Sequence, residues 1–327
     1  MKSFTIRLKG LWRDPTTFAG VLFVTSLVIS LIQEPTIVSP RFLSGTLSVA
    51  IPLVIGAMAV TPAILSGSGG MDLSVGPLMG FINVVVVTVL MPAHLGEWWI
   101  AVPLLLTLGL AIGAINGWLV AVVRLQPIVA TLGTYLVLSG ASLWLLPSPL
   151  GPVPAWFGAL SRTWAGIPAP LLLVAGPAAI WFALGRTPYL RTLLAVGGDD
   201  RVAYSAGIDV TLVRILAYSI GGLFAAFAGI ALTSLIQSAD ATLGAPYTLQ
   251  VITAAALGGI SLAGGRGRMW GSAFGAMTLF LIQSLLTNNG VSVFWQQVVF
   301  GMTLILALVF NAMLGMVSST SRERASS

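Results

Sequence analysis

Hydrophobic residues in this chain gather into long runs that short polar connections separate. Ten runs approach the roughly twenty residues that a helix needs to cross a bilayer. They cover residues 15–33, 43–65, 74–92, 98–123, 128–147, 169–185, 214–236, 248–263, 270–287 and 295–316. Proline and glycine interrupt the third and eighth runs, which favours broken or partly re-entrant helices there. The pattern predicts an all-α, polytopic integral membrane protein with about ten transmembrane helices in one domain.

Composition supports this class and excludes others. The 327 residues are 57% hydrophobic and only 7% charged, as in polytopic membrane proteins. Without cysteine, and with His94 as the single histidine, the chain lacks the usual zinc ligands, and we expect no metal site. The net charge of +6 does not indicate nucleic-acid binding, because in a membrane protein the location of the charges matters more than their sum.

The basic residues fix an expected orientation. If the first run starts inside, thirteen of the fifteen Lys and Arg residues fall on the cytoplasmic side, and only Arg41 and Arg162 fall outside. Both termini are then cytoplasmic. A cleaved signal peptide would also begin with a basic segment and an apolar run, but no small-residue cleavage site follows residue 33, which favours a retained first span.

Residues 186–214 form a polar island between apolar runs, with four arginines and three aspartates. Its middle is typical of one short helix. Asp199 and Asp200 suit the N-terminus of that helix, and Gly207 suits the position after its last turn. An apolar face is expected from Val202, Ala203 and Ala206. Such a helix offers a soluble partner a surface to push on, whereas the alternative is an ordinary solvated loop.

Polar residues at membrane depth are the candidates for a translocation path. They are uncharged: Ser66, Asn83, Asn116, Gln126, Thr131, Gln250, Thr253 and Gln283. A transporter driven by protons or sodium usually needs buried carboxylates, and by this topology only Asp72 lies at a membrane boundary. The energy source is therefore expected outside the chain.

Two glycine-rich stretches, 66–77 and 257–268, precede spans that run outward. Neither matches a phosphate-binding loop, so we expect no ATP site and no bound cofactor in this chain. We expect Asp72 to cap the next helix, with substrate contact as the alternative. Arg266 and Arg268 are expected to anchor headgroups or to contact a cytoplasmic partner.

Four segments resemble, in the same order, the inner-membrane permeases of ribose-type sugar ABC importers. The first is GGMDLSVG at residues 69–76, and the second is QPIVATLGT at residues 126–134. AVGG at 195–198, with AGI at 206–208, resembles the cytoplasmic coupling segment, and GGISLAGGRG at 258–267 resembles the last motif. The motif residues are Gly69, Gly70, Asp72, Leu73, Ser74, Gly76, Gly258, Gly259, Ser261, Gly264, Gly265 and Gly267.

The resemblance implies a non-enzymatic permease subunit in the bacterial inner membrane that moves a monosaccharide-like sugar. It implies a dimer of permeases, homo- or heteromeric, two ATPase subunits that bind the ATP, and a periplasmic binding protein. Coupling to the ATPase then falls on Gly198, Asp199, Asp200, Arg201, Tyr204, Ala206, Gly207 and Ile208. The chain departs from the family at Asp199-Asp200, where Asn and an acidic residue are usual.

Three other functions stay open from the sequence. A branched-chain amino acid importer is the alternative substrate class, although the DLSVG form favours a sugar. A stand-alone channel or secondary transporter is disfavoured by the scarcity of buried carboxylates. An intramembrane enzyme would need a carboxylate, metal or Ser–His constellation, and His94 is expected at the outer interface.

Overall fold

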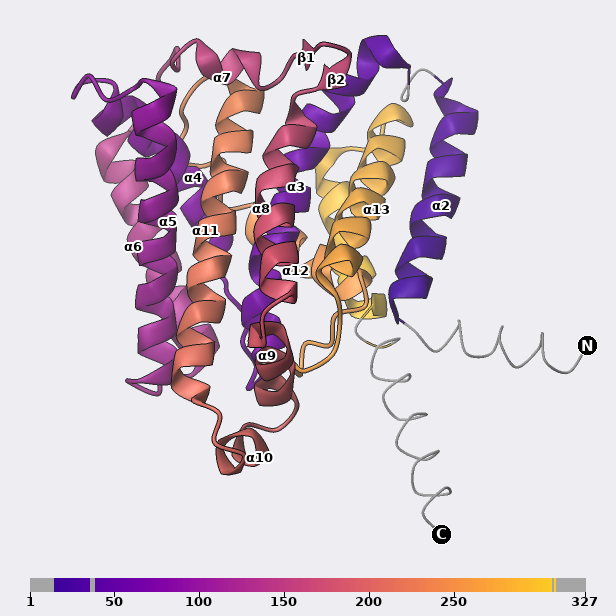
Figure 1. Cartoon of the computed structure of the whole chain (residues 1–327). Coiled ribbons are helices and arrows are strands. Elements are labelled where there is room, and N and C mark those ends of the chain that lie inside the picture. Colours follow the sequence, from indigo (N-terminus) through magenta and orange to yellow (C-terminus); the bar gives the residue numbers. More distant parts are fainter. Residues whose placement is uncertain (1–14, 36–38, 308, 310–327) are drawn as a thin grey trace, which may run out of the picture.

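The computed structural model describes residues 15–35, 39–307 and 309, and shows an upright bundle of helices (Figure 1). The helices are α2 (Pro15–Gln33), α3 (Pro40–Leu65), α4 (Val75–Val85), α5 (Trp98–Ala121), α6 (Pro127–Leu145), α7 (Trp156–Ala159), α8 (Pro170–Gly185), α9 (Tyr189–Gly198), α10 (Asp200–Ser205), α11 (Val210–Ile236), α12 (Tyr247–Leu257) and α13 (Met269–Asn288). A π-helical turn, η2 (Val86–Leu90), extends α4, and a further helix covers Val293–Ala307.

Every predicted apolar run coincides with a helix among the described residues. Five helices are long and apolar enough to cross a membrane, and the count rises to six if α8 and α9 form one bent span. Four shorter apolar helices occupy the other predicted spans: Ala19–Gln33, Val75–Leu90, Tyr247–Leu257 and Val293–Ala307. The end of the tenth predicted span and both chain termini lie outside the described residues, so their cytoplasmic placement stays a prediction.

The third and eighth spans are short, as the glycine pattern indicated. α4 begins only after the loop 66–74, and its last turns widen into the π-helical η2. α12 has 11 residues and ends at Leu257, and Gly258 and Gly259 follow it; Gly259 has a φ of 80° that few other residues adopt easily. Both short helices therefore leave loop segments at the end of the bundle where α10 lies.

The sequence pattern did not predict a small cap at the opposite end of the bundle. There α7 and a two-residue hairpin, β1 (Thr163–Trp164) and β2 (Ile167–Pro168), cross the ends of the helices (Figure 1). Ser161, between α7 and β1, donates to the carbonyl of Ser234 at 2.7 Å, which ties the cap to α11.

The centre of the bundle is built on α11, which packs most extensively against α5 and α3. The glycines of α5 make this approach possible. Gly109 and Gly113 lie against the backbone of Gly222, and Gly117 lies against Ile215, so a side chain at any of the three would overlap α11. Glycines spaced four residues apart lie on one face of a helix, which lets the backbones of α5 and α11 approach closely.

Arginines are concentrated at one end of the bundle. Of the nine described arginines, Arg41 and Arg162 lie at the end with the hairpin, and the other seven lie at the end with α10: Arg124, Arg186, Arg191, Arg201, Arg214, Arg266 and Arg268. The alternation of helix directions therefore preserves the predicted charge asymmetry within the described residues.

Candidate functional site

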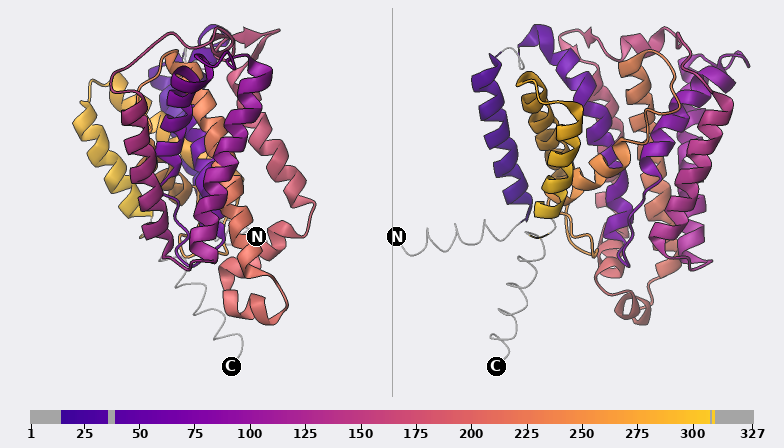
Figure 2. Two further views of the ribbon diagram at one scale, coloured as in Figure 1. Left: turned by 90° about the vertical axis from the view of Figure 1, so that its left-hand side faces the viewer. Right: turned by 180° about the vertical axis from the view of Figure 1, so that it is seen from behind.

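The short helix predicted in the middle of the polar island is α10, and a second helix that the sequence did not predict, α9, precedes it. α9 follows α8 after a bend of 84° at Arg186–Pro188, and α10 follows α9 directly. Pro188 begins the new helix, since its fixed φ suits a helix start and it cannot continue the hydrogen bonds of α8. Figures 1 and 2 show α10 beyond the ends of the neighbouring helices.

The caps of α10 are those that the sequence predicted. Asp199 is the N-cap, and its Oδ1 accepts hydrogen bonds from the amides of Arg201 (3.0 Å) and Val202 (3.1 Å). Gly207 follows the last turn with a φ of 82°, and its amide donates to the carbonyl of Tyr204 at 2.9 Å. These caps stabilise a six-residue helix that is too short to be stable alone.

The predicted apolar face of α10 is only partly correct. Ala203 is buried, and the amide of Ile208 donates to its carbonyl at 3.1 Å. Val202 and Ala206 are exposed instead, because α10 meets the bundle only along the side that carries Ala203. Val202 is 65% exposed and Tyr204 is 74% exposed, so a large apolar surface projects from the tip of the island.

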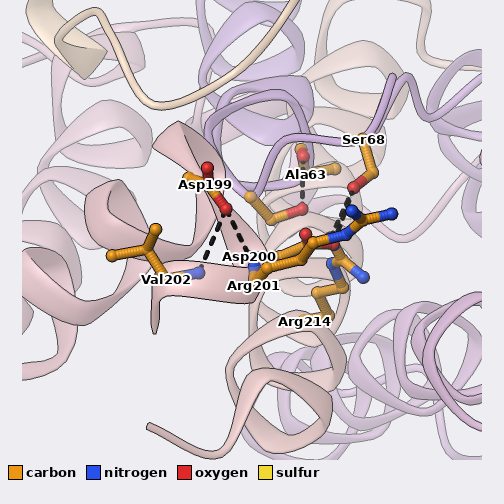
Figure 3. A network of polar contacts seen from close by, with 8 residues as sticks. Ala63, Ser68, Asp199, Asp200, Arg201, Val202 and Arg214 are labelled. Atoms are coloured by element: carbon orange, nitrogen blue, oxygen red, sulfur yellow. Dashed lines mark hydrogen bonds and ion pairs between the residues drawn. The ribbon is translucent and has the colours of Figure 1, made fainter. Parts of the chain in front are cut away.

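An ion pair ties α10 to the bundle (Figure 3). The Nη2 atom of Arg214 lies 2.9 Å from Oδ2 of Asp200 and also donates to Oγ of Ser68. The hydroxyl of Ser68 in turn lies 3.4 Å from Oδ2 of Asp200. The hydrogen bond from Arg214 holds the pKa of the Asp200 carboxyl below its ordinary value. Asp200 therefore links α10 both to α11 and to the loop 66–70.

Three glycine segments meet where α9 ends, and we call this contact the glycine junction: Gly67, Gly197, Gly264 and Gly265. A side chain at Gly197 would overlap the carbonyl oxygen of Leu65 and would lie 2.6 Å from the amide nitrogen of Gly265. A side chain at Gly67 would lie 2.7 Å from the Cα of Gly197. The amide of Gly265 donates to the carbonyl of Leu65 at 3.2 Å. The two glycine-rich stretches and the coupling segment are thus in direct backbone contact.

The conformation of the second glycine-rich stretch explains its glycines. Gly264, Gly265 and Gly267 all have positive φ, at 97°, 65° and 131°. Ser261 closes the turn, since its amide donates to the carbonyl of Arg266 at 3.0 Å and its carbonyl accepts from the amide of Gly264 at 2.9 Å. At the start of this stretch, a side chain at Gly258 would overlap the backbone of Gly271 in α13.

Asp72 organises the first motif. Its Oδ1 accepts from both the amide (2.9 Å) and the hydroxyl (2.6 Å) of Ser74. Ser74 is itself the N-cap of α4. Asp72 therefore stabilises the turn before the helix, whereas we had expected it to cap the first N–H groups of α4. The hydroxyl of Ser74 accepts from Nδ2 of Asn116 at 2.9 Å, and Oδ1 of Asn116 accepts from Thr134.

A second turn of the same kind, which the sequence analysis missed, precedes α12. Oδ1 of Asp240 accepts from the amide and the hydroxyl of Thr242, both at 2.8 Å. In each case the aspartate is followed two residues later by Ser or Thr and four residues later by glycine, as in DLSVG and DATLG. Gly76 and Gly244 lie backbone to backbone, so a side chain on either would overlap the other. The shared spacing was the signal available in the sequence.

The structure gives five of the predicted path residues partners inside the subunit. Ser66 and Thr253 are buried, and each donates to a backbone carbonyl of its own helix at 2.7 Å. Asn116 and Thr131 belong to the network around the first motif, where Thr131 accepts from the amide of Leu73 at 3.2 Å. Asn83 donates to Thr233 and Ser238 and accepts from the amide of Asp240.

The other three path candidates lie nearer the surface of the subunit. Gln126 is exposed at the start of α6, and Gln250 and Gln283 are half-buried on α12 and α13. Among the described residues, no group of three or more His, Asp or Glu side chains lies together as metal ligands would.

The sequence of the chain matches a known protein family. Residues 42–308 match the family model described as "Branched-chain amino acid transport system / permease component". No solved structure matches the chain.

Individual relatives cover most of the chain. The ribose import permease protein RbsC of Bacillus subtilis is 33% identical over 311 residues, which is 94% of this chain and 95% of the relative. Its Escherichia coli K12 namesake is 34% identical over 78% of this chain and 81% of the relative. The galactose/methyl galactoside import permease protein MglC of Salmonella typhimurium is 28% identical over 90% and 93%.

Proposed function

The chain belongs to the family of the branched-chain amino acid transport system permease component, and on that premise we propose that it is the membrane-spanning subunit of an ATP-driven sugar importer. It is a multi-pass membrane protein with the helices of a permease, and we assign it to the bacterial inner membrane. ATP binding and hydrolysis are assigned to a separate subunit, and no cofactor to this chain.

The proposed substrate is a monosaccharide-class sugar. Support comes from the relatives, which are described as ribose and galactose or methyl galactoside import permeases. The description of the family also names branched-chain amino acids, but none of the relatives reported above does so. A sugar therefore takes precedence over a branched-chain amino acid as the substrate class.

The observation that carries the coupling role is the exposure of α10. Val202 and Tyr204 present apolar surface at the tip of a helix that lies beyond the ends of its neighbours (Figure 1). Aromatic side chains that project in this way are typical anchors for a partner protein. We assign this surface to the ATPase subunit, as the resemblance of residues 195–208 to a coupling segment implies.

The glycine junction connects α9 and α10 to the bundle, so a displacement of α10 by the ATPase reaches the bundle there. The caps make α10 a compact unit, and Asp200 holds it against Arg214 and Ser68. Gly197 then transmits displacement through backbone contacts to Leu65 and Gly265, with no intervening side chain that could change rotamer. Because close-packed atoms resist compression, a displacement of α10 moves the loops 66–74 and 258–268 with it. The loop 66–74 leads into the short helix α4, and the loop 258–268 joins the short helix α12 to α13.

The complete importer requires further subunits. A second permease, identical or related, forms the central path between two bundles, and a periplasmic binding protein delivers the sugar to the end that carries α7 and the hairpin. Gln126, Gln250 and Gln283 remain the candidates for contact with the sugar, because none of them is enclosed within the bundle.

Uptake into proteoliposomes tests this function. The chain is reconstituted with its ATPase and binding protein, and uptake of labelled ribose, galactose and leucine is measured with and without ATP. ATP-dependent uptake of a sugar, and not of leucine, is the expected result. Equal uptake without ATPase and ATP would support a stand-alone transporter instead, and ATP-driven uptake of leucine alone would support the amino acid alternative.

A further inference from the structure

A cavity of about 230 Å³ lies between α9 and the start of α13. Its lining residues are Leu65, Trp181, Leu190, Leu193, Leu194, Gly267, Arg268, Met269 and Trp270. Leu65, Leu193 and Met269 are buried and form an apolar floor. Leu194 and Trp270, which are 38% and 49% exposed, form the rim, so the cavity opens to the surface of the subunit.

The position of the cavity is that of a membrane–water boundary. It lies at the end of the bundle where seven of the nine described arginines are found, beside the bend between α8 and α9. Trp181 and Trp270 are residues that favour the interfacial region of a bilayer. A bilayer boundary at these residues would place the floor at the depth of acyl chains and the rim at the depth of headgroups.

The rim is positively charged. Arg268 lines the cavity and is exposed, and Arg191 and Arg266 adjoin other lining residues in the sequence. Among the described residues, the only salt bridge joins Asp200 and Arg214. Arg191, Arg266 and Arg268 therefore have no carboxylate partner there. An anion at the rim would supply the missing countercharge.

We propose that this cavity binds one anionic phospholipid, with the end of an acyl chain on the apolar floor and the phosphate at Arg268. The size fits this occupant, because 230 Å³ is below the roughly 300–1,000 Å³ of pockets that enclose a whole small molecule. Basic pockets between helices on the cytoplasmic side are suited to anionic headgroups. The assignment to the inner leaflet rests on the proposed function, but the binding itself does not.

The bound lipid touches the elements that meet at the glycine junction. Leu65 ends α3, Leu190, Leu193 and Leu194 belong to α9, and Met269 and Trp270 begin α13. An acyl chain held among these residues contacts α3, α9 and α13 from the membrane side. The lipid therefore acts as an additional contact between the coupling segment and the bundle, and its loss loosens that contact.

Native mass spectrometry of the permease alone tests the proposal. The detergent-purified subunit is titrated with phosphatidylglycerol and with phosphatidylcholine of identical acyl chains. Phosphatidylglycerol is expected to bind about fivefold more tightly, the effect of one cationic side chain near an anionic lipid. Arg268→Gln is expected to abolish the preference, and Arg268→Lys to retain it. Leu194→Phe, which fills the rim, is expected to weaken both lipids.

Arg124→Gln is the matched control, because Arg124 is an exposed arginine at the same end of the bundle but does not line the cavity. Its preference for phosphatidylglycerol should equal that of the wild type. The proposal is overturned if Arg268→Gln keeps the preference, or if Leu194→Phe binds both lipids normally. Complete displacement of the lipid by millimolar inorganic phosphate would also overturn it, since that result indicates an anion site without a chain. Because neither ATPase nor sugar is present, failure here leaves the transport function untouched, and the reverse also holds.

Discussion

The backbone of Gly197 in α9 lies so close to the carbonyl oxygen of Leu65 at the end of α3 that a methyl group on residue 197 would overlap that oxygen. The next residue is different, since a side-chain atom on Gly198 would meet nothing within 4 Å. The packing excludes a side chain at Gly197 but leaves room for one at Gly198. The two adjacent glycines therefore form a matched pair for experiment.

Gly197→Ala is expected to destabilise the protein by about 1–3 kcal/mol, the usual range for forcing extra atoms into a packed contact. Gly198→Ala is expected to leave stability unchanged or to raise it by up to about 1 kcal/mol, because alanine favours the helix. Thermal unfolding in detergent measures both. Equal unfolding temperatures for the two variants would show that the glycine junction is not closely packed.

The pair formed by Asp200 and Arg214 predicts a particular dependence on pH. Its hydrogen bond lowers the pKa of Asp200 in the folded protein below the ordinary value of 3.8. The stabilisation is therefore complete above about pH 4 and is lost as the pH falls through the lower, folded-state pKa. Asp200→Asn should cost no more than about 1 kcal/mol, because the Asp200 side chain is 40% exposed to solvent that screens the charge.

The measurement compares unfolding temperatures of wild type and Asp200→Asn from pH 8 down to pH 3. The difference should stay constant from pH 8 to pH 5 and shrink below pH 4. A difference that already changes between pH 8 and pH 6 would mean that another group, and not Asp200, controls the contact.

The N-cap of α10 predicts a local effect. Asp199→Ala removes the acceptor for the amides of Arg201 and Val202 and should cost about 0.5–2 kcal/mol of helix stability. Hydrogen exchange of residues 200–206 should accelerate severalfold while exchange in α5 and α11 stays unchanged. Asp199→Ser, which keeps an acceptor, should restore protection, and failure to do so would argue against the capping role.

Asn116 and Gln250 separate a structural amide from a path amide. Asn116→Leu leaves the Ser74 hydroxyl without its donor and leaves the Thr134 hydroxyl with only the carbonyl of Ala130 as acceptor, at a cost of about 1–3 kcal/mol, so the unfolding temperature falls. Sugar uptake per folded molecule should be unchanged. Gln250→Leu should lower sugar uptake and leave the unfolding temperature unchanged, because Gln250 is half-buried on α12 and is proposed to face the path. Unfolding temperature and uptake, normalised to folded protein, measure both variants.

The sequence predicted the positions of the helices well, because bilayer-length apolar runs and their glycine or proline interruptions leave few alternatives. Asp199 and Gly207 were also recognisable, since caps are local and depend on a few adjacent residues. The division of the island at Asp199 into α9 and α10 was missed because both halves carry similar polarity. Pro188 was the local signal for a new helix start.

The long-range contacts were beyond the sequence. Ser68 and Asp200 are 132 residues apart, and nothing in either segment specifies that their side chains meet. All eight path candidates were predicted because they are polar at membrane depth, but that property also describes residues that bond inside the bundle. Asn83, Asn116 and Thr131 are of the second kind, with partners on other elements.

The ATPase is proposed to act through the exposed tip of α10, and variants of this tip test that role. ATP hydrolysis and sugar uptake are measured together in proteoliposomes for the wild type, for the double variant Val202→Ala/Tyr204→Ala, and for Trp164→Ala, an exposed aromatic at the opposite end of the bundle. We expect at least a tenfold loss of uptake and of sugar-stimulated hydrolysis in the double variant, as for truncation of an interface anchor, with an unchanged unfolding temperature. Trp164→Ala should have normal activity. Uptake at the wild-type rate in the double variant would contradict the account.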